Sequence, residues 1–141
     1  MSDLNAKQTV LGRAELIDFP AHGLFGVPAR VDTGAKTSSI WASQVKLSGG
    51  LLHVVLFGPG SQFYSGQVLT FDGFKKAVVS TSMGEIDERY KVRLSVRIGG
   101  RRVGAFFTLA DRSTQVYPVL IGRNVLLGKF IVDVKKMLGR H

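Results

Sequence analysis

Two runs of alternating apolar and polar residues, separated by Gly99 and Gly100, constrain the fold of this chain more than any other feature. From Tyr90 to Ile98 every second residue is apolar, and the same two-residue period returns from Arg101 to Leu109. A strand with this period presents one face to a core and the other to solvent. Two glycines between such strands predict a tight β-hairpin. We therefore expect a half-buried antiparallel pair within a β-rich fold.

Short apolar runs bounded by turn residues predict the other strands. These runs are Val10 to Ile17, Pro28 to Asp32, Ile40 to Leu47, Leu51 to Phe57, Gln67 to Phe71, Phe74 to Ser80 and Val119 to Ile121. Helical signal is confined to Asn124 to Leu127. The sequence thus predicts an all-β fold, a small closed barrel with one short helix near the C-terminus.

A carboxylate directly follows one of these predicted strands. Asp32-Thr33-Gly34-Ala35 comes after the apolar approach Val27 to Val31. An Asp between a strand and a glycine turn is the nucleus of an aspartic protease. It is also an ordinary turn signal, because Asp favours turn entry and Gly accepts positive φ. The later run Val119 to Asn124, a strand that ends at a glycine and opens into the predicted helix, favours the protease interpretation.

The chain resembles retropepsin-like aspartic peptidases, and more closely the bacterial family known as ATP-dependent zinc proteases. The matching segments are Arg30 to Ser39, Thr108 to Ser113, Pro118 to Arg123 and Phe130 to Asp133. The resemblance implies an aspartic endopeptidase with a retropepsin-like domain over residues 10–134. An N-terminal tail of residues 1–9 and a basic C-terminal tail of residues 135–141 would flank this domain.

The chemistry of aspartic peptidases needs two carboxylates. One acts as a base on water, while the other is protonated and donates to the carbonyl oxygen of the peptide bond. The chain has one such motif, and its 141 residues cover one lobe rather than two. The resemblance therefore implies a homodimer in which each subunit supplies Asp32 at the two-fold axis.

The resemblance also assigns supporting roles beside Asp32. The hydroxyl of Thr33 would reach the partner's loop, although a Thr at a strand end can also satisfy its own backbone. Gly34 would let backbone and substrate approach closely. Ala35 would support the same loop. Gly122 would let the crossing segment pass behind it. Alternatively, Gly122 is simply the glycine at the entry to the predicted helix, which would have the same position.

An ion pair typical of retropepsins is missing from this sequence. They commonly place an acid after the motif, where it pairs with the arginine that follows the later glycine. Here Lys36 occupies the acid's position and Arg123 is the arginine. We expect Arg123 to pair with another carboxylate, either Asp111 or Asp133.

A peptidase of this fold also needs a lid over the substrate. The run from Ser80 to Glu85 is small, polar and glycine-containing, and it lies where a retropepsin flap tip would be. An ordinary exposed hairpin loop is the alternative. The flap residues expected to bind substrate are Ser82, Met83, Gly84 and Glu85.

The residues do not indicate a cofactor or a metal site. There is no cysteine, and His22, His53 and His141 have no neighbours at zinc-ligand spacing. No glycine-rich phosphate loop followed by Lys-Ser or Lys-Thr is present. We therefore expect neither a catalytic zinc nor ATP hydrolysis by this chain.

Net charge is the second functional clue, because it is +9. Basic residues follow the solvent face of the predicted hairpin, namely Arg89, Lys91, Arg93, Arg97, Arg101 and Arg102. Such a stripe is either a solvated face or a surface that attracts a polyanion. The resemblance favours acidic or glutamate-modified protein tails as substrate, and an ATP-grasp glutamate ligase as partner.

Two other functions stay open. The chain could be a non-catalytic basic barrel that binds RNA, a ribosome surface or a ligase, although it has no stacking-aromatic motif of an RNA module, so nucleic acid is the less favoured partner. It could also be a dimeric adaptor of the same fold. No apolar run is long enough to span a bilayer and Met1 to Pro20 contains no signal-peptide core, so we expect cytoplasmic residence and no membrane association.

Overall fold

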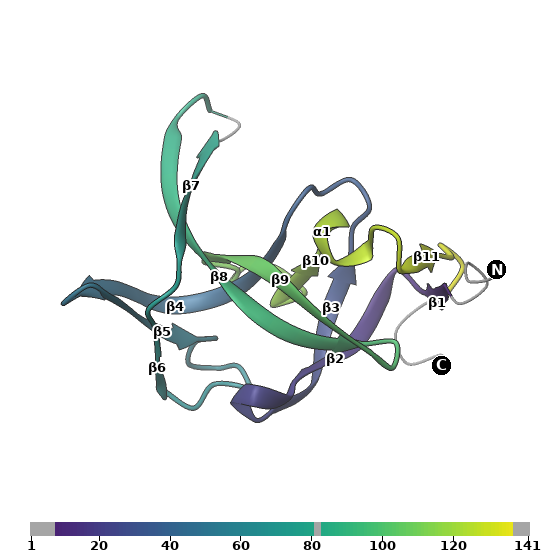
Figure 1. Ribbon diagram of the computed structural model, residues 1–141, viewed down its shortest axis with the longest axis horizontal. Coiled ribbons are helices and arrows are strands. Elements are labelled where there is room, and N and C mark those ends of the chain that lie inside the picture. Colours follow the sequence, from purple (N-terminus) through teal and green to yellow (C-terminus); the bar gives the residue numbers. More distant parts are fainter. Residues whose placement is uncertain (1–7, 81–82, 137–141) are drawn as a thin grey trace.

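The computed structural model describes residues 8–80 and 83–136, which form a β-barrel with one α-helix of a single turn (Figure 1). Ser82 and most of the two predicted tails lie outside these residues. The elements in chain order are β1 (Thr9–Leu11), β2 (Ala14–Phe19), the 3-10 turn η2 (Pro20–His22), β3 (Leu24–Val31), β4 (Ser38–Ser48), β5 (Leu51–Leu56), β6 (Val68–Phe71), β7 (Lys75–Ser80), β8 (Ile86–Ile98), β9 (Arg101–Ala110), β10 (Val119–Ile121), α1 (Arg123–Leu126) and β11 (Phe130–Val132).

Strand β10 closes the barrel, because it pairs with two strands at once. It runs parallel to β3, with Val119 opposite Ala29, and antiparallel to β4, with Val119 opposite Ile40. The order β3-β2-β8-β9-β4 completes the ring. The prediction of an all-β closed barrel with one short helix near the C-terminus is therefore confirmed.

The core is filled by the alternating residues that predicted the central hairpin. Strands β8 and β9 pair in register, with Val92 opposite Phe107 and Leu94 opposite Ala105, and all four side chains are buried. Phe107 also packs edge-on against Phe19 of β2, with ring centroids 5.6 Å apart. The polar residues between them face outward, as the two-residue period predicts.

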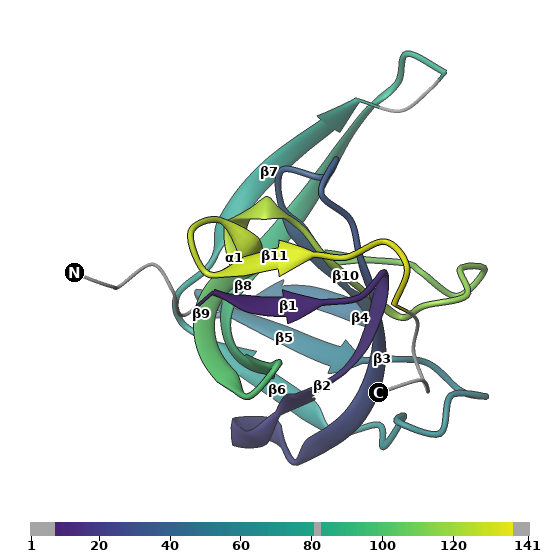
Figure 2. The ribbon, with the colours of Figure 1, turned by 90° about the vertical axis from the view of Figure 1, so that its right-hand side faces the viewer.

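The prediction of one strand from Val10 to Ile17 is wrong, because the chain breaks at Gly12 and Arg13. The Gly12 N–H donates to the Glu15 carboxylate at 2.6 Å, and the Arg13 N–H donates to the Lys136 carbonyl at 3.0 Å. Strand β1 then pairs in parallel with β11, a strand that the apolar pattern did not predict, and Figure 2 shows the two side by side. Local periodicity carries no information about such a distant partner.

A long hairpin projects from the barrel in both views (Figures 1 and 2). It consists of β7 and the first half of β8, paired from Lys75 opposite Lys91 to Ser80 opposite Ile86. We call it the β7–β8 arm. Because of this pairing, β8 begins at Ile86, four residues before the predicted start at Tyr90. In the described part of the chain, no helix is long and apolar enough to cross a membrane.

Candidate functional site

Asp32 lies just after β3, in the connection to β4 that we call the Asp32 loop (residues 32–37). Its carboxylate accepts a hydrogen bond from the Gly34 N–H at 2.9 Å, and its carbonyl accepts one from the Ala35 N–H at 3.2 Å. The Asp32 N–H donates to the Ile121 carbonyl of β10 at 2.9 Å. The carboxylate is thus held by its own tight turn, and the turn is tied to the strand that closes the barrel.

The chain after β10 crosses directly behind the Asp32 loop. The Arg123 N–H donates to the Ala35 carbonyl at 2.8 Å. A Cβ atom at Gly122 would lie 2.5 Å from the Thr37 carbonyl oxygen and 2.9 Å from that of Ala35. There is no space for a side chain, so this position requires glycine for close approach rather than for backbone freedom.

A buried polar network that the sequence pattern did not indicate fixes this crossing. The hydroxyl of Ser38, which is fully buried, donates to Asn124 Oδ1 at 2.8 Å and accepts from the Gly122 N–H at 2.9 Å. The Asn124 side-chain amide donates to the Phe106 carbonyl at 2.8 Å. Each group has a partner, as buried polar groups require. Ser38 lies within one of the segments that carried the resemblance and Asn124 directly follows another, which was the available signal.

The expected carboxylate partner of Arg123 is not found among the described residues. Its guanidinium donates instead to the Thr33 carbonyl at 3.1 Å. Asp111 accepts from Ser113, whose side-chain and backbone hydrogen bonds lower the pKa of the Asp111 carboxyl, and Asp133 accepts from the Lys135 N–H at 3.0 Å. The expectation is wrong because the Thr33 carbonyl, which is also an acceptor, lies within reach of the guanidinium, whereas both acids accept hydrogen bonds within their own turns.

Three of the four expected flap residues, Met83, Gly84 and Glu85, lie at the tip of the β7–β8 arm. Met83 is highly exposed, and Gly84 has a φ of +81°, in the left-handed region. Ser82 lies outside the described residues. Neither Met83, Gly84 nor Glu85 lines the cavity beside Asp32. The structure therefore places these residues on a projecting arm and does not bring them to the carboxylate.

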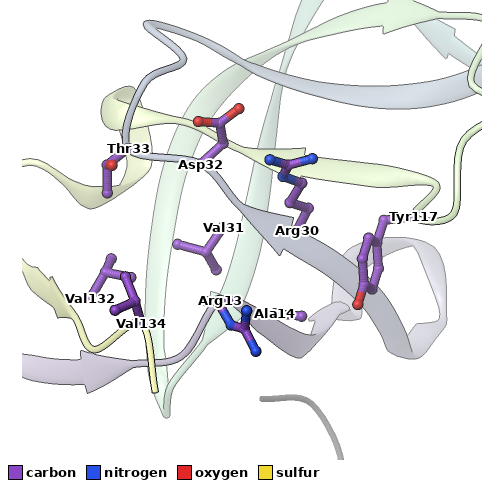
Figure 3. Close-up of a pocket in the computed structure, with 9 residues that line it drawn as sticks. All are labelled: Arg13, Ala14, Arg30, Val31, Asp32, Thr33, Tyr117, Val132 and Val134. Carbon is purple, nitrogen blue, oxygen red and sulfur yellow. The ribbon is translucent and has the colours of Figure 1, made fainter. Parts of the chain in front are cut away.

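A cavity of about 480 Å³ opens beside Asp32 (Figure 3). Strand β3 supplies Arg30 and Val31 to its wall, and the Asp32 loop supplies Asp32 and Thr33. Thr33 is exposed, and within the described residues its hydroxyl has no hydrogen-bond partner. The other lining residues are Arg13, Ala14, Tyr117, Val132 and Val134.

The basic stripe on the β8–β9 hairpin is partly neutralised. Arg97 forms an ion pair with Asp18 at 3.0 Å, and Arg89 forms one with Asp87 at 3.2 Å. Lys75 and Lys91 lie over the Phe106 ring, 4.8 and 5.7 Å from its centroid. None of the stripe residues lines the cavity beside Asp32, so its arginines, Arg13 and Arg30, are separate from this outer face. Among the described residues, no group of three or more His, Cys, Asp and Glu side chains could hold a metal ion.

The geometry of Asp32 and its crossing segment agrees with a family match over residues 10–140. The matching RimB-like family is described as the retropepsin-like aspartic endopeptidase RimB. The chain belongs to the RimB-like family. The retropepsin-like part of the sequence resemblance is thereby confirmed, whereas the family description gives no support to the name zinc protease.

Curated relatives of this RimB-like chain carry a different name. A probable alpha-L-glutamate ligase from Shewanella halifaxensis (strain HAW-EB4) is 28% identical in an alignment of 136 positions that covers 88% of this chain and 28% of the relative. A probable alpha-L-glutamate ligase from Desulfotalea psychrophila (strain LSv54 / DSM 12343) is 26% identical, with the same coverage. The chain thus spans less than a third of the length of these ligases.

A solved structure shares the fold of the RimB-like chain. It is a protein of unknown function from Legionella pneumophila subsp. pneumophila str. Philadelphia 1, with a TM-score of 0.68 and 20% sequence identity. The match covers 93% of this chain and 97% of that protein. At this identity the likeness concerns the fold alone.

Proposed function

We propose that this chain is an aspartic endopeptidase whose two carboxylates are Asp32 from each of two subunits. The observation that carries the proposal is the position of Asp32. Its carboxylate is held by the Gly34 N–H at the mouth of a cavity, in a loop fixed from behind by Gly122. Membership of a family described as an aspartic endopeptidase supports it.

The chemistry follows from two carboxylates that share one proton. The ionised Asp32 takes a proton from water, and the resulting hydroxide bonds to the carbonyl carbon of the peptide. The protonated Asp32 of the other subunit gives its proton to the carbonyl oxygen. The C–N bond then breaks as the leaving nitrogen receives the proton that was taken from water. One hydroxyl of the intermediate returns its proton to the second carboxylate, so a carboxylic acid and an amine leave and the pair again shares one proton.

Apolar surface beside the Asp32 loop supports the assembly of two subunits. Val10 on β1, Ile131 on β11 and Val134 just beyond β11 are 44, 51 and 69% exposed. Val134 and Val132 also line the Asp32 cavity, so this surface and the cavity are continuous. Exposed apolar side chains that adjoin a half-complete site are suited to a contact between copies of the chain.

We further propose acidic or glutamate-modified protein tails as the substrate. The net charge of +9 favours anionic peptides. Relatives named as probable alpha-L-glutamate ligases connect this sequence type with glutamate chemistry and make such a ligase a candidate partner.

Loss of cleavage with Asp32→Asn tests the proposal. Wild-type and Asp32→Asn proteins are incubated with a peptide library and a cell lysate, and new termini are compared. In an equal mixture of the two proteins, random pairing leaves about a quarter of dimers with both carboxylates intact. Activity should therefore fall to about a quarter of that of the same total amount of wild type. A fall to half would show that single subunits act alone.

A second candidate is a non-catalytic module that binds a glutamate ligase. The observation that favours it is that similar sequences occur as a part, about 28%, of the length of probable alpha-L-glutamate ligases. Co-elution with such a ligase, without new peptide termini in the assays above, would favour this function over hydrolysis.

A further inference from the structure

The cavity beside Asp32 contains arginines that the proposed reaction does not use. Arg30 precedes Asp32 by two residues, so a strand's alternation places both side chains on the same side of β3, and Val31 between them points the other way (Figure 3). Arg30 is exposed, whereas Val31 is buried. The guanidinium of Arg30 therefore faces the space that a substrate must enter to reach Asp32.

This positive charge is not compensated within the described chain. Neither Arg30 nor Arg13 has a side-chain hydrogen bond or ion pair there, and Asp32 is the one acid that lines the cavity. Burial lowers the pKa of Arg112, and the charge of Arg30 lowers it further. The Arg112 guanidinium is engaged by the Tyr117 carbonyl at 3.0 Å. Arg30 and Arg13 thus remain available to an anion.

The walls of the cavity strengthen attraction to a carboxylate. Ala14, Val132 and Val134 are apolar and line the same cavity. Fully solvated ion pairs contribute little, because water screens them. A guanidinium at the edge of an apolar cavity is screened less, and its planar fork matches a carboxylate.

We propose that Arg30 receives the side-chain carboxylate of the substrate residue next to the scissile bond, with Arg13 adding a second positive charge in the cavity. The inference rests on the proposed function. A two-fold axis would place a second Arg30 on the opposite side of the carboxylate pair. Both residues that flank the scissile bond should then be acidic, so the preferred bond joins two glutamates.

The experiment uses two peptides that differ only in a central Glu-Glu or Gln-Gln pair. For the wild type, we expect kcat/KM to be about a hundredfold higher for Glu-Glu, about tenfold for each of the two charge-assisted hydrogen bonds in a partly exposed site. Arg30→Gln should remove this ratio, and Arg30→Glu should favour a Lys-Lys peptide. Arg93→Gln is the matched control, because Arg93 is an exposed arginine on the outer face of β8. It should keep the wild-type ratio.

Binding of the same peptides to Asp32→Asn protein, measured by fluorescence anisotropy, separates the inference from the proposed function. If no variant cleaves but Arg30→Gln abolishes preferential binding of Glu-Glu, the subsite stands and hydrolysis does not. If wild type cleaves and Arg30→Gln retains the ratio, or slows both peptides equally, the subsite is refuted while hydrolysis stands. If neither cleavage nor preferential binding occurs, both are refuted.

Discussion

Replacing Gly122 by alanine should destabilise the protein through a single methyl group. Gly122 has φ −102° and ψ −173°, an extended conformation that alanine adopts without backbone strain. The added Cβ would lie 2.5 Å from the Thr37 carbonyl oxygen and 2.7 Å from its carbon, which are backbone atoms and cannot rotate away. The Asp32 loop must therefore shift.

The size of the effect follows from what the shift disrupts. Overpacking of this kind costs about 1–3 kcal/mol. Moving the loop also weakens the Arg123 N–H bond to the Ala35 carbonyl, worth about 1 kcal/mol. We expect Gly122→Ala to lower the free energy of unfolding by about 2–4 kcal/mol, a large share of the ~5–15 kcal/mol of an ordinary domain. Peptidase activity should fall as well.

Gly104→Ala is a matched control for urea unfolding followed by circular dichroism. A Cβ at Gly104 would lie 2.6 Å from Nη2 of Arg93, which is the far end of a flexible exposed side chain. That side chain can swing aside, so the variant should be neutral or more stable by about 0.5–1 kcal/mol, since glycine weakens a strand. If the two variants unfold at the same urea concentration, the crossing has more space than this reasoning allows.

Two further outcomes are expected. Gly84→Ala and Gly100→Ala place alanine at similar φ, +81° and +79°, with no atom near the added Cβ, so each should lower the stability by about 1 kcal/mol. In peptide-cleavage assays, only Gly84→Ala should slow turnover. Equal rates for the two variants would make the arm an ordinary hairpin. Burial lowers the pKa of His22 below 6.5, so the folded state favours the neutral imidazole. The contribution of this residue to stability is therefore present above pH 6.5 and is lost as pH falls through the folded pKa. His22→Phe should reduce the change of the urea midpoint with pH between pH 5 and 8. An unchanged pH dependence would exclude His22 as its cause.

The sequence predicted those parts of the fold that depend on local pattern. The two-residue period of β8 and β9 gave the hairpin and its buried face, because one buried side of a strand dictates every second residue. The Asp32 turn was also visible, since the residue types Asp and Gly mark such a turn themselves.

Features that depend on distant partners could not be predicted in this way. The break at Gly12 follows from the position of Lys136, near the other end of the chain. The partner of Arg123 was sought among acids, although a backbone carbonyl, which every residue carries, was the acceptor. Arg30 was read as part of a motif, and its role in the cavity became visible only once β3 was placed beside the segments that form the other walls.

The closure of the barrel by β10 also sets the order in which the site can be assembled. On the ribosome, Asp32 emerges first, but the Ile121 carbonyl that accepts its N–H belongs to a strand made much later. At about 5–20 residues per second, the segment between them takes several seconds to synthesise. A nascent chain that ends before β10 carries the motif without the backbone that orients it. We therefore expect the carboxylate to stay unpositioned until almost the whole barrel has left the ribosome.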